Sequence, residues 1–373
     1  MLLPIQLHAI TIYVNPGGSI QDAINSAVNG DTIIVRAGTY TGPGNRDLDF
    51  GGRAITVRSE SGAASTIIDC QDAGRGFHFH SGETTTSVLD GFTIREASSD
   101  RGSGIYCTSQ SGPTIANCVV THCTVTGTSA GCNGGGIYCF DGSHATITNC
   151  TISYNLASSD GGGVCCRTSN PMIVNCRIIG NVANDDGGGL DCGGTATTII
   201  NSIIAENSAA QAGGGLMGSA PSFVELTHCT IAGNSAPYGA GVACSSPVLT
   251  NCVLWGNQGD ALVSESATVT YSDVEGGWAG EGNIDADPLF VSGTMHDYYL
   301  SQVAAGQGAD SPCVDAGSDL AANLGLGEYT TRTDGMPDMG IVDLGYHAVP
   351  EPSIFILFAI GALALALRQR ARR

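Results

Sequence analysis

Acidic side chains close to clusters of glycine are the residues of this sequence best placed to do chemistry. The catalytic candidates are four carboxyls and one guanidinium: Asp160, Asp185, Asp186, Asp191 and Arg167. Two carboxyls about 5 to 9.5 Å apart can hydrolyse a glycosidic bond, and carboxylates beside a basic residue could hold Ca²⁺ and take part in proton transfer. Asp is also common before glycine in turns, which explains Asp160 and Asp186 without catalysis. We therefore favour a non-catalytic protein and keep the five residues as candidates.

Aromatic and histidine side chains supply a second set of candidates. Tyr106 and Tyr138 occupy equivalent positions and are expected to point outward, where their rings could stack on sugars. Their β-propensity explains them equally well. His78 and His80 lie two residues apart and are expected to face outward together, but two His make at most half of a zinc site.

Asp334, Asp338 and Asp343 could hold Ca²⁺, which takes oxygen ligands. No EF-hand or repeated calcium motif accompanies them, so we expect these residues to cap turns. No motif in the chain requires a cofactor, and Ca²⁺ is the ion that its acidic residues would suit.

The composition argues against a partner that is itself strongly anionic. The chain has 373 residues, contains no Lys, and carries a formal net charge of -20. Nucleic acid and anionic lipid are bound by clustered Lys and Arg, so an acidic chain of this kind repels both. We expect no nucleic-acid role.

A repeat of 26 or 27 residues organises the middle of the chain. Glycine clusters followed by an apolar-x-Cys pattern recur, as in GGGIYC ending at Cys139 and GGGVCC ending at Cys166. A second run follows each cluster, such as ITNCTISYN at 147–155, and no segment of helical period lies between the runs. Short β-rich runs at a constant period predict a solenoid of strands.

One residue in each repeat marks a corner of the coil. Ile147 and Cys150 are three residues apart, whereas inward side chains on a single strand lie two apart, so the chain must bend between them. The residues at this bend are Asn117, Asn149, Asn175, Asn201, His228 and Asn251. Asn tolerates a left-handed backbone, and amides stacked about 4.8 Å apart could hydrogen-bond as a ladder.

Most of the fifteen cysteines fall into two columns. The first column holds Cys107, Cys139, Cys166, Cys192 and Cys244, and the second holds Cys118, Cys150, Cys176, Cys229 and Cys252. Both alternate with aliphatic residues, so we expect buried free thiols; their spacing of about 4.8 Å exceeds the roughly 3.5 to 4.5 Å of a disulfide. Cys123 and Cys132 bracket an insertion and form the bridge that we predict.

The segment IYVNPGGSIQDAINSAVNGDTIIVRAGTY, at 12–40, resembles the N-terminal cap of pectate-lyase-like right-handed β-helices. Within it, Ser19 and Asp22 resemble a capping box. The apolar helical face that follows consists of Ile20, Ala23, Ile24 and Ala27. With the NC-x-I and GGG repeats, the resemblance covers residues 12–277. It implies an all-β fold, a single-stranded right-handed parallel β-helix (solenoid) with an N-terminal capping helix that covers its open strand edges.

The rest of the chain resembles a surface-protein tail followed by a sorting signal. Residues 278–348, with DADPLF at 285–290, are similar to a tail of many bacterial surface β-helices. In residues 349–373, Pro350, Glu351 and Pro352 precede an apolar stretch and RQRARR, which resembles the PEP-CTERM sorting signal of Gram-negative bacteria. The resemblance implies recognition by an exosortase, cleavage near these prolines, and a cell-surface, outer-envelope or extracellular-matrix destination. It also implies a C-terminal transmembrane sorting helix that holds the chain in the membrane before processing.

Residues 1–11 are expected to be the remnant of a signal peptide, because MLLPIQLHA lacks a basic region and export then requires a start upstream of Met1. We thus expect an exported, non-catalytic β-helix that binds extracellular polysaccharide or partner proteins along its side wall. The alternative is a polysaccharide lyase or glycoside hydrolase of the pectate-lyase-like fold.

Overall fold

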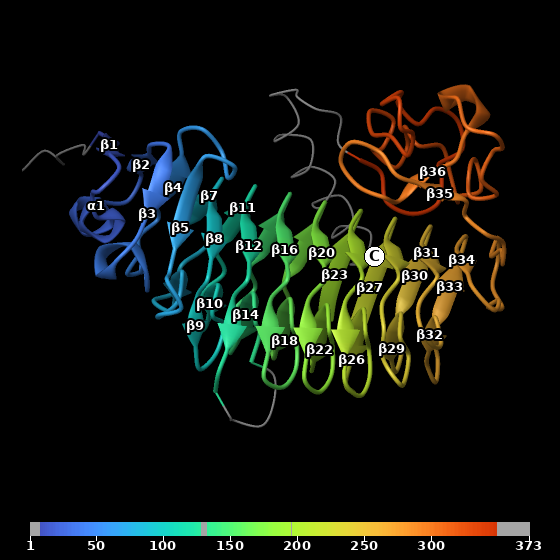
Figure 1. Cartoon of the computed structure of the whole chain (residues 1–373), viewed down its shortest axis with the longest axis horizontal. Helices are drawn as coiled ribbons and strands as arrows, with labels where there is room; N and C mark the ends of the chain where they lie inside the picture. Colours follow the sequence, from blue (N-terminus) through green and yellow to red (C-terminus); the bar gives the residue numbers. More distant parts are fainter. Residues whose placement is uncertain (1–7, 128–132, 195, 349–373) are drawn as a thin grey trace, which may run out of the picture.

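The computed structural model describes residues 8–127, 133–194 and 196–348. The chain winds into an elongated solenoid, over one side of which a C-terminal tail folds back (Figure 1). Strands at equivalent positions of successive coils pair in parallel and in register, as in Ile105 with Ile137 and Ile137 with Val164. The predicted right-handed parallel β-helix is therefore confirmed.

Four parallel sheets form the wall of the solenoid. The first sheet contains β1 (Thr11–Val14), β2 (Thr32–Val35), β4 (Thr56–Ser59), β7 (Val88–Asp90), β11 (Thr114–Ala116), β15 (Thr146–Thr148), β19 (Met172–Val174), β23 (Ala196–Ile200), β27 (Phe223–Thr227), β30 (Val248–Thr250) and β33 (Thr268–Thr270). The second sheet contains β3 (Gly38–Tyr40), β5 (Thr66–Asp69), β8 (Thr93–Arg95), β12 (Val119–Thr121), β16 (Thr151–Ser153), β20 (Arg177–Ile179), β24 (Ile203–Ala205), β28 (Thr230–Ala232), β31 (Val253–Trp255) and β34 (Asp273–Val274).

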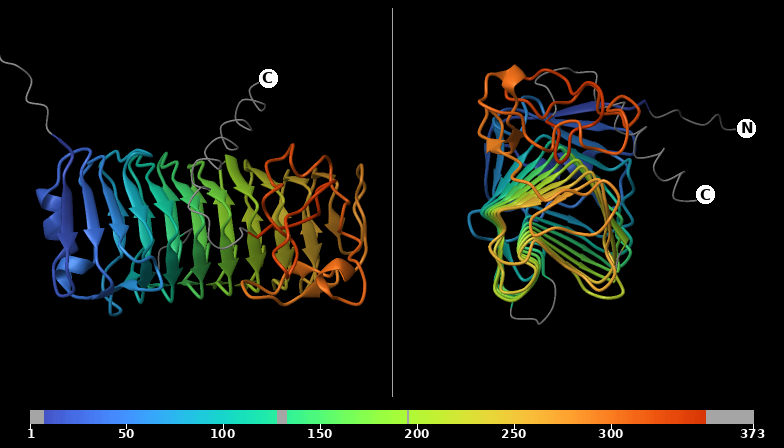
Figure 2. Two further views of the ribbon diagram at one scale, coloured as in Figure 1. Left: turned by 90° about the horizontal axis from the view of Figure 1, so that it is seen from above. Right: turned by 90° about the vertical axis from the view of Figure 1, so that its right-hand side faces the viewer.

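The two remaining sheets lie on the other side of each coil. The third sheet contains β6 (Phe77–Phe79), β10 (Ile105–Cys107), β14 (Ile137–Phe140), β18 (Val164–Arg167), β22 (Leu190–Gly193), β26 (Leu216–Gly218), β29 (Val242–Cys244) and β32 (Leu262–Val263). The short fourth sheet contains β9 (Ser98–Ser99), β13 (Thr124–Val125), β17 (Leu156–Ala157), β21 (Val182–Ala183) and β25 (Ser208–Ala209). Seen end-on, successive coils superpose, which is the geometry that a constant repeat length produces (Figure 2).

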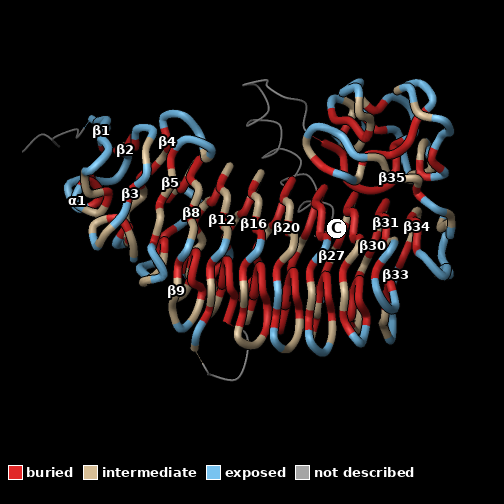
Figure 3. Tube along the Cα trace, viewed as in Figure 1, coloured by how far each residue is buried: buried red, intermediate tan, exposed pale blue. Residues whose placement is uncertain are grey.

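Inward side chains of successive coils form one continuous core. Ile147 of the first sheet and Ile152 of the second are fully buried, as is Cys139 of the third. The buried stretches follow the strands, while exposed residues gather at loops and at the two ends (Figure 3). Because each coil buries its apolar side chains against its neighbours, the core extends along the axis instead of closing within one unit.

The predicted corner between the first two sheets is confirmed. All six residues that mark it have a left-handed backbone, with φ from 45° at Asn201 to 56° at Asn251. The expected ladder forms between some of them: the Asn201 amide donates to Asn175 at 2.8 Å, and the Asn175 amide donates to Asn149 at 3.2 Å.

A second ladder of asparagines, which the sequence analysis did not identify, runs through the interior. Its members end each copy of the second repeat element: Asn155, Asn181, Asn207, Asn234 and Asn257. The Asn207 side-chain oxygen accepts from the Asn181 backbone N–H at 2.9 Å, and the Asn207 amide donates to the Ile178 carbonyl at 2.9 Å. These amides satisfy backbone groups at a buried bend, where an unpaired group would cost free energy.

The cysteine columns are buried free thiols, as predicted, but the predicted disulfide is not formed. Cys139 lies in register with Cys107 and Cys166, and all three are free. Cys123 is also a free thiol with no exposed surface, so it makes no bridge to Cys132, which lies outside the described residues. Among the described cysteines, Cys165 is the one that is disulfide-bonded. The two cysteines differ because their side chains point in opposite directions. Cys123 packs into the core, whereas Cys165 alternates with core residues and faces outward.

A short helix lies at the N-terminal end of the solenoid. Helix α1 (Ile20–Ser26) begins after Ser19, whose hydroxyl accepts from the Asp22 N–H at 3.0 Å. Ile20 and Ile24 are fully buried in the core. A 3₁₀ turn, η1 (Pro43–Asn45), packs beside the helix.

The tail after the last coil packs on the outer face of the second sheet. It contains an antiparallel pair, β35 (Phe290–Val291) and β36 (Tyr299–Leu300), and the 3₁₀ turn η2 (Val303–Ala305). Tyr346 and Tyr299 of the tail cluster with Ile203 of β24, and Leu344 clusters with Val253 of β31. No helix in the described ranges is both long and apolar enough to cross a bilayer. The predicted sorting residues Pro350, Glu351 and Pro352, with the terminal helix expected beyond them, lie outside the described residues, as do residues 1–7 of the expected signal-peptide remnant.

Candidate functional site

The glycine triplets bend the chain tightly at the start of the third sheet, at a position that we call the glycine corner. The first glycine of the triplet has a left-handed backbone, with φ of 72° at Gly161 and 67° at Gly187. A Cβ at Gly187 would lie 2.7 Å from the Asp191 Cβ, and one at Gly161 would lie 2.7 Å from the Cys165 Cβ. Only glycine fits here, because the backbone lies directly against the outward side chains of the third sheet.

Those outward side chains form a column, which we call the outward column. Its members, in register, are His78, Tyr106, Tyr138, Cys165, Asp191, Met217, Ala243 and Val263. Although Asp191 faces away from the core, only 1% of it is exposed. The glycine corner thus buries a carboxyl that strand alternation alone would place in water.

All five predicted catalytic candidates meet at the glycine corner. Carboxylate oxygens of Asp160, Asp185 and Asp186 lie within 4.8 Å of one another. The Arg167 guanidinium, from the end of β18, lies 3.3 Å from the Asp160 carboxylate and 3.5 Å from that of Asp191. The repeat of 26 residues produces this convergence, because it stacks Asp186 one coil above Asp160.

Backbone donors fix the orientation of two of the carboxylates. The Asp186 N–H donates to Asp160 Oδ1 at 3.3 Å, and the Ala212 N–H donates to Asp186 Oδ1 at 2.9 Å. Each Asp therefore caps the turn of the next coil, which is the structural role expected for Asp before glycine. The second oxygen of Asp160 contacts Arg167, whereas Asp186 keeps its second oxygen for another partner.

Burial and mutual repulsion raise the pKa of two carboxyls in this cluster. Burial raises the pKa of Asp191 to about 7, although the positive charge of Arg167 acts in the opposite direction. The pKa of Asp186 is also raised, first by burial and then by the neighbouring charge of Asp185. Asp191 Oδ1 has no hydrogen-bond partner among the described residues. The cluster therefore holds more negative charge than its one guanidinium balances.

The three clustered carboxylates suit a divalent cation better than they suit a pair of hydrolytic acids. Ca²⁺ holds its oxygen ligands at about 2.3 to 2.6 Å, so two ligands of one ion lie up to about 5 Å apart. The oxygens of Asp160, Asp185 and Asp186 meet this limit. The carboxyls of a glycosidase are spaced at roughly 5 to 9.5 Å.

The predicted aromatic candidates pack against one another in the outward column. The rings of Tyr106 and Tyr138 stack on each other at 5.2 Å, and His78 stacks on Tyr106 at 5.0 Å. Tyr138 is only 3% exposed. Ring faces that cover one another leave little surface for a sugar, so the geometry gives no support to sugar binding at these two tyrosines. Within the described ranges, the group of carboxylates that could hold a metal ion does not include His78 or His80. Burial lowers the pKa of His78 to about 4, and His80 contacts Asp49 at 3.3 Å.

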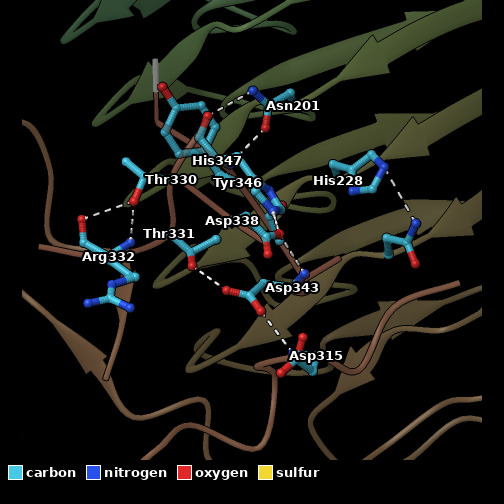
Figure 4. A network of polar contacts seen from close by, with 12 residues as sticks. Asn201, His228, Asp315, Thr330, Thr331, Arg332, Asp338, Asp343, Tyr346 and His347 are labelled. Carbon is cyan, nitrogen blue, oxygen red and sulfur yellow. Dashed lines mark hydrogen bonds and ion pairs between the residues drawn. The ribbon is translucent and has the colours of Figure 1, made fainter. Parts of the chain in front are cut away.

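Among the described residues, the three aspartates of the tail do not form a group close enough to hold a metal ion. Asp338 and Asp343 lie in one polar network (Figure 4). Asp334 forms an ion pair with Arg332. Asp338 lies 2.9 Å from His347 Nε2 and accepts from the Asp343 N–H at 2.9 Å. Each of the three carboxylates thus contacts neighbouring residues of the tail, and the calcium site stays a prediction.

The same network attaches the tail to the Asn corner. The amide of Asn201 donates to the His347 carbonyl at 2.8 Å, and the His347 N–H donates back to Asn201 at 2.7 Å (Figure 4). The Tyr346 N–H donates to the Thr230 hydroxyl at 3.0 Å. Neither this contact nor a role for Tyr238 was predicted from the sequence. Tyr238 lies at the glycine corner two coils beyond Asp186.

Comparisons with known proteins agree with this architecture. Residues 103–274 match the model of a family described as a right-handed β-helix region, and residues 348–373 match the PEP-CTERM protein-sorting motif. A comparison with curated proteins finds no match. The sorting motif implies processing by an exosortase and points to export and a cell-surface or extracellular location in a bacterium.

The solved structure of a pectate lyase shares the fold. The crystal structure of pectate lyase Pel9A aligns with a TM-score of 0.52 at 17% identity, over 91% of this chain and 98% of that chain. A structure of the alginate lyase AlyGC aligns with a TM-score of 0.32 at 15% identity, over 70% of this chain and 37% of that chain. At such identities the likeness to pectate lyase shows the fold alone.

Proposed function

We propose that this protein is a non-catalytic β-helix of the bacterial cell surface that binds an acidic polysaccharide through a divalent cation. The cation would be held by Asp160, Asp185 and Asp186. The observation that carries the proposal is the meeting of these three carboxylates within 4.8 Å at the glycine corner. A cation at this place would let a chain with a formal net charge of -20 attract a carboxylated ligand.

The same site offers little for a lyase reaction. The chain contains no Lys. Arg167 is held between the carboxylates of Asp160 and Asp191, so its guanidinium donates to protein carboxylates. Removal of a proton from a uronate needs a base that can accept it, so these contacts support binding over β-elimination.

The alternative function is a polysaccharide lyase or glycoside hydrolase. The raised pKa of Asp191 favours it, because a carboxyl that keeps its proton near neutral pH is what a general acid requires. The burial of Asp191 opposes it, since only 1% of this residue reaches solvent. A buried carboxyl would have to be uncovered before it could reach a glycosidic oxygen.

Export and display complete the proposal. An exosortase of a Gram-negative-type bacterium would cleave near Pro350 to Pro352, after the terminal segment had held the chain in the membrane. Helix α1 would close the N-terminal end of the solenoid, since Ile20 and Ile24 fill the first coils. The surface would then carry a closed, rigid rod with the glycine corner open to extracellular polysaccharide.

Calorimetry and activity assays on the purified protein test this function. Ca²⁺ is titrated into wild type, Asp186→Asn and the matched control Asp141→Asn, which changes an exposed turn residue away from the glycine corner. Polygalacturonate and alginate are then titrated with and without Ca²⁺. Unsaturated products and new reducing ends are measured in parallel.

We expect Ca²⁺ to bind wild type and Asp141→Asn with a dissociation constant of about 10⁻⁴ to 10⁻³ M, as in extracellular modules. Asp186→Asn should bind Ca²⁺ about tenfold more weakly or not at all, and the polysaccharide should bind only with Ca²⁺. Turnover that is lost in both Asp186→Asn and Arg167→Ala would establish the enzyme alternative. Equal Ca²⁺ binding by Asp186→Asn and wild type would overturn the assignment of the site.

A further inference from the structure

Tyr238 lies on the glycine corner in the same column as the two coil-capping aspartates. The residue before the first glycine of the corner is Asp160, Asp186, Ala212 and Tyr238 in successive coils, where the first three precede GGG and Tyr238 precedes GAG. Ala212 pairs with Tyr238 in a parallel bridge, and the Gly213 N–H donates to the Tyr238 carbonyl at 3.0 Å. Two coils separate Asp186 from Tyr238, which corresponds to about 10 Å at the usual strand spacing of about 4.8 Å.

The Tyr238 side chain is exposed to solvent, unlike that of Tyr138 in the outward column. It is 55% exposed, compared with 3% for Tyr138. The ring of Tyr138 is covered by Tyr106 and Phe140. Tyr238 therefore presents an aromatic surface to solvent.

A cavity of about 310 Å³ lies beside this ring. Met217, Ala243 and Val263 line it, and these residues continue the outward column directly beyond Asp191. The other parts of its wall include Ser219, Ser245 and Ser264. The cavity thus joins an apolar surface and one aromatic ring to several hydroxyl groups, and its volume is at the lower end of the range for small-ligand sites.

This combination matches the chemistry of a sugar ring. A pyranose has C–H groups that pack on aromatic and aliphatic surfaces, and hydroxyls at its edge that need hydrogen-bond partners. Tyr and Trp serve such amphipathic ligands because an apolar ring is joined to a polar group. The serines around the cavity supply donors and acceptors for the sugar hydroxyls.

We propose that Tyr238 and the cavity beside it form a subsite for one pyranose unit of a polysaccharide chain that runs along the solenoid axis. This subsite deepens the proposed function and rests on it, since the carboxylate cluster would bind the same chain two coils away. The part of the sugar that contacts the cavity is an uncharged face of the ring. The lining residues include the acidic Glu265 and no basic residue.

Variants of Tyr238 test the subsite without disturbing the fold. The backbone of Tyr238 is held by hydrogen bonds of its carbonyl and of its N–H, which donates to Gln211 at 3.2 Å. Tyr238→Ala removes the ring, and Tyr238→Phe keeps the ring but removes the hydroxyl. Tyr154→Ala is the matched control, because Tyr154 is 57% exposed and follows β16, in the second sheet.

The experiment measures two affinities for each full-length variant: Ca²⁺ alone by calorimetry, and polygalacturonate or alginate in saturating Ca²⁺ by affinity electrophoresis. Tyr238→Ala should bind polysaccharide about tenfold more weakly, as expected for the loss of one aromatic stacking contact. Its Ca²⁺ affinity should equal that of wild type. Tyr238→Phe and Tyr154→Ala should bind polysaccharide within about twofold of wild type.

The outcomes separate this proposal from the function on which it rests. Unchanged polysaccharide affinity in Tyr238→Ala would overturn the subsite alone. Binding that needs Tyr238 but neither Ca²⁺ nor Asp186 would support the subsite and overturn the cation-bridged function. Absence of binding to both polysaccharides by wild type, with Ca²⁺ present, would overturn both proposals.

Discussion

The free energy of unfolding of Asp191→Asn, compared with that of wild type, should increase as the pH rises from acidic to neutral. The folded protein holds Asp191 in a site that is 1% exposed, and burial raises its pKa from 3.8 to about 7. Between these two values the folded state keeps a proton that the unfolded chain has released. Raising the pH through this window therefore favours unfolding of wild type, whereas Asn has no proton to lose.

The size of the effect follows from the shift of the pKa. Each pH unit inside the window changes the free energy of unfolding by about 1.4 kcal/mol, so wild type should lose about 2.5 kcal/mol relative to Asp191→Asn between pH 5 and pH 7. The variant also loses the contact of Asp191 with Arg167. That loss should cost less than about 1 kcal/mol, because the guanidinium is 36% exposed and keeps its contact with Asp160.

Urea denaturation followed by circular dichroism at pH 5, 6 and 7 measures the difference in the free energy of unfolding between wild type and Asp191→Asn. Urea is uncharged and therefore does not screen the interactions between charges. Asp141→Asn, at an exposed turn, is the control and should show a difference from wild type that does not change with pH. A constant difference for Asp191→Asn over the same range would refute the reasoning, because burial of a charge would then not govern this carboxyl. Destabilisation that grows with pH would refute it as well.

Three further predictions concern the site, the interior ladder and the tail. Ca²⁺ affinity measured by calorimetry should rise between pH 6 and pH 8, because burial raises the pKa of Asp191 to about 7 and the charge that this carboxyl gains beside the cluster attracts the cation. Asn207→Ala should lower the free energy of unfolding by about 3 kcal/mol, since it leaves buried backbone groups unpaired; Asn149→Ala, in the partly exposed corner ladder, should cost about 1 kcal/mol in the same urea titration. Tyr346→Ala should weaken the packing of the tail on β24, and limited proteolysis should then release tail peptides before the solenoid is cut.

The repeat and its corners were predictable because their causes are local. A left-handed bend can be read from Asn149 and its equivalents, and strand alternation places Cys150 and Ile152 on one side. The interior ladder was not predicted, although Asn207 and its equivalents recur at the same spacing. Polar residues at the end of a strand suggest an exposed turn, and only the three-dimensional path of the chain shows that these amides are buried.

The strand beneath the tail has consecutive buried residues, which the alternation of buried and exposed side chains along a strand does not explain. In β24, Ile203, Ile204 and Ala205 are all buried, so both faces of this strand are covered. Consecutive apolar residues are typical of strands covered on both sides. The sequence IINSIIAEN thus contained evidence for a second layer, but nothing local shows which segment supplies it.

The residues that form the candidate site could be predicted from the sequence, but their exposure and their pKa values could not. In-register stacking brings Asp160 and Asp186 together as soon as the repeat length is known. The same register places Tyr106 on Tyr138, ring against ring, and removes the surface that would contact a sugar. The pKa of Asp191 depends on burial by the glycine corner, which alternation alone does not reveal.

Attachment and ligand binding would occupy different sides of the rod. The tail ends its described part at Ala348, which is fully buried and packs with Ile203 against the second sheet. The glycine corner, at the third and fourth sheets, lies on the side away from the tail (Figures 1 and 2). A chain anchored through the segment that follows Ala348 would therefore keep Asp186 and Tyr238 accessible along the opposite edge. Because successive coils repeat this edge at a constant spacing, a long polysaccharide could contact the cation site and the sugar subsite at once, and two weak contacts joined in this way bind more tightly than either alone.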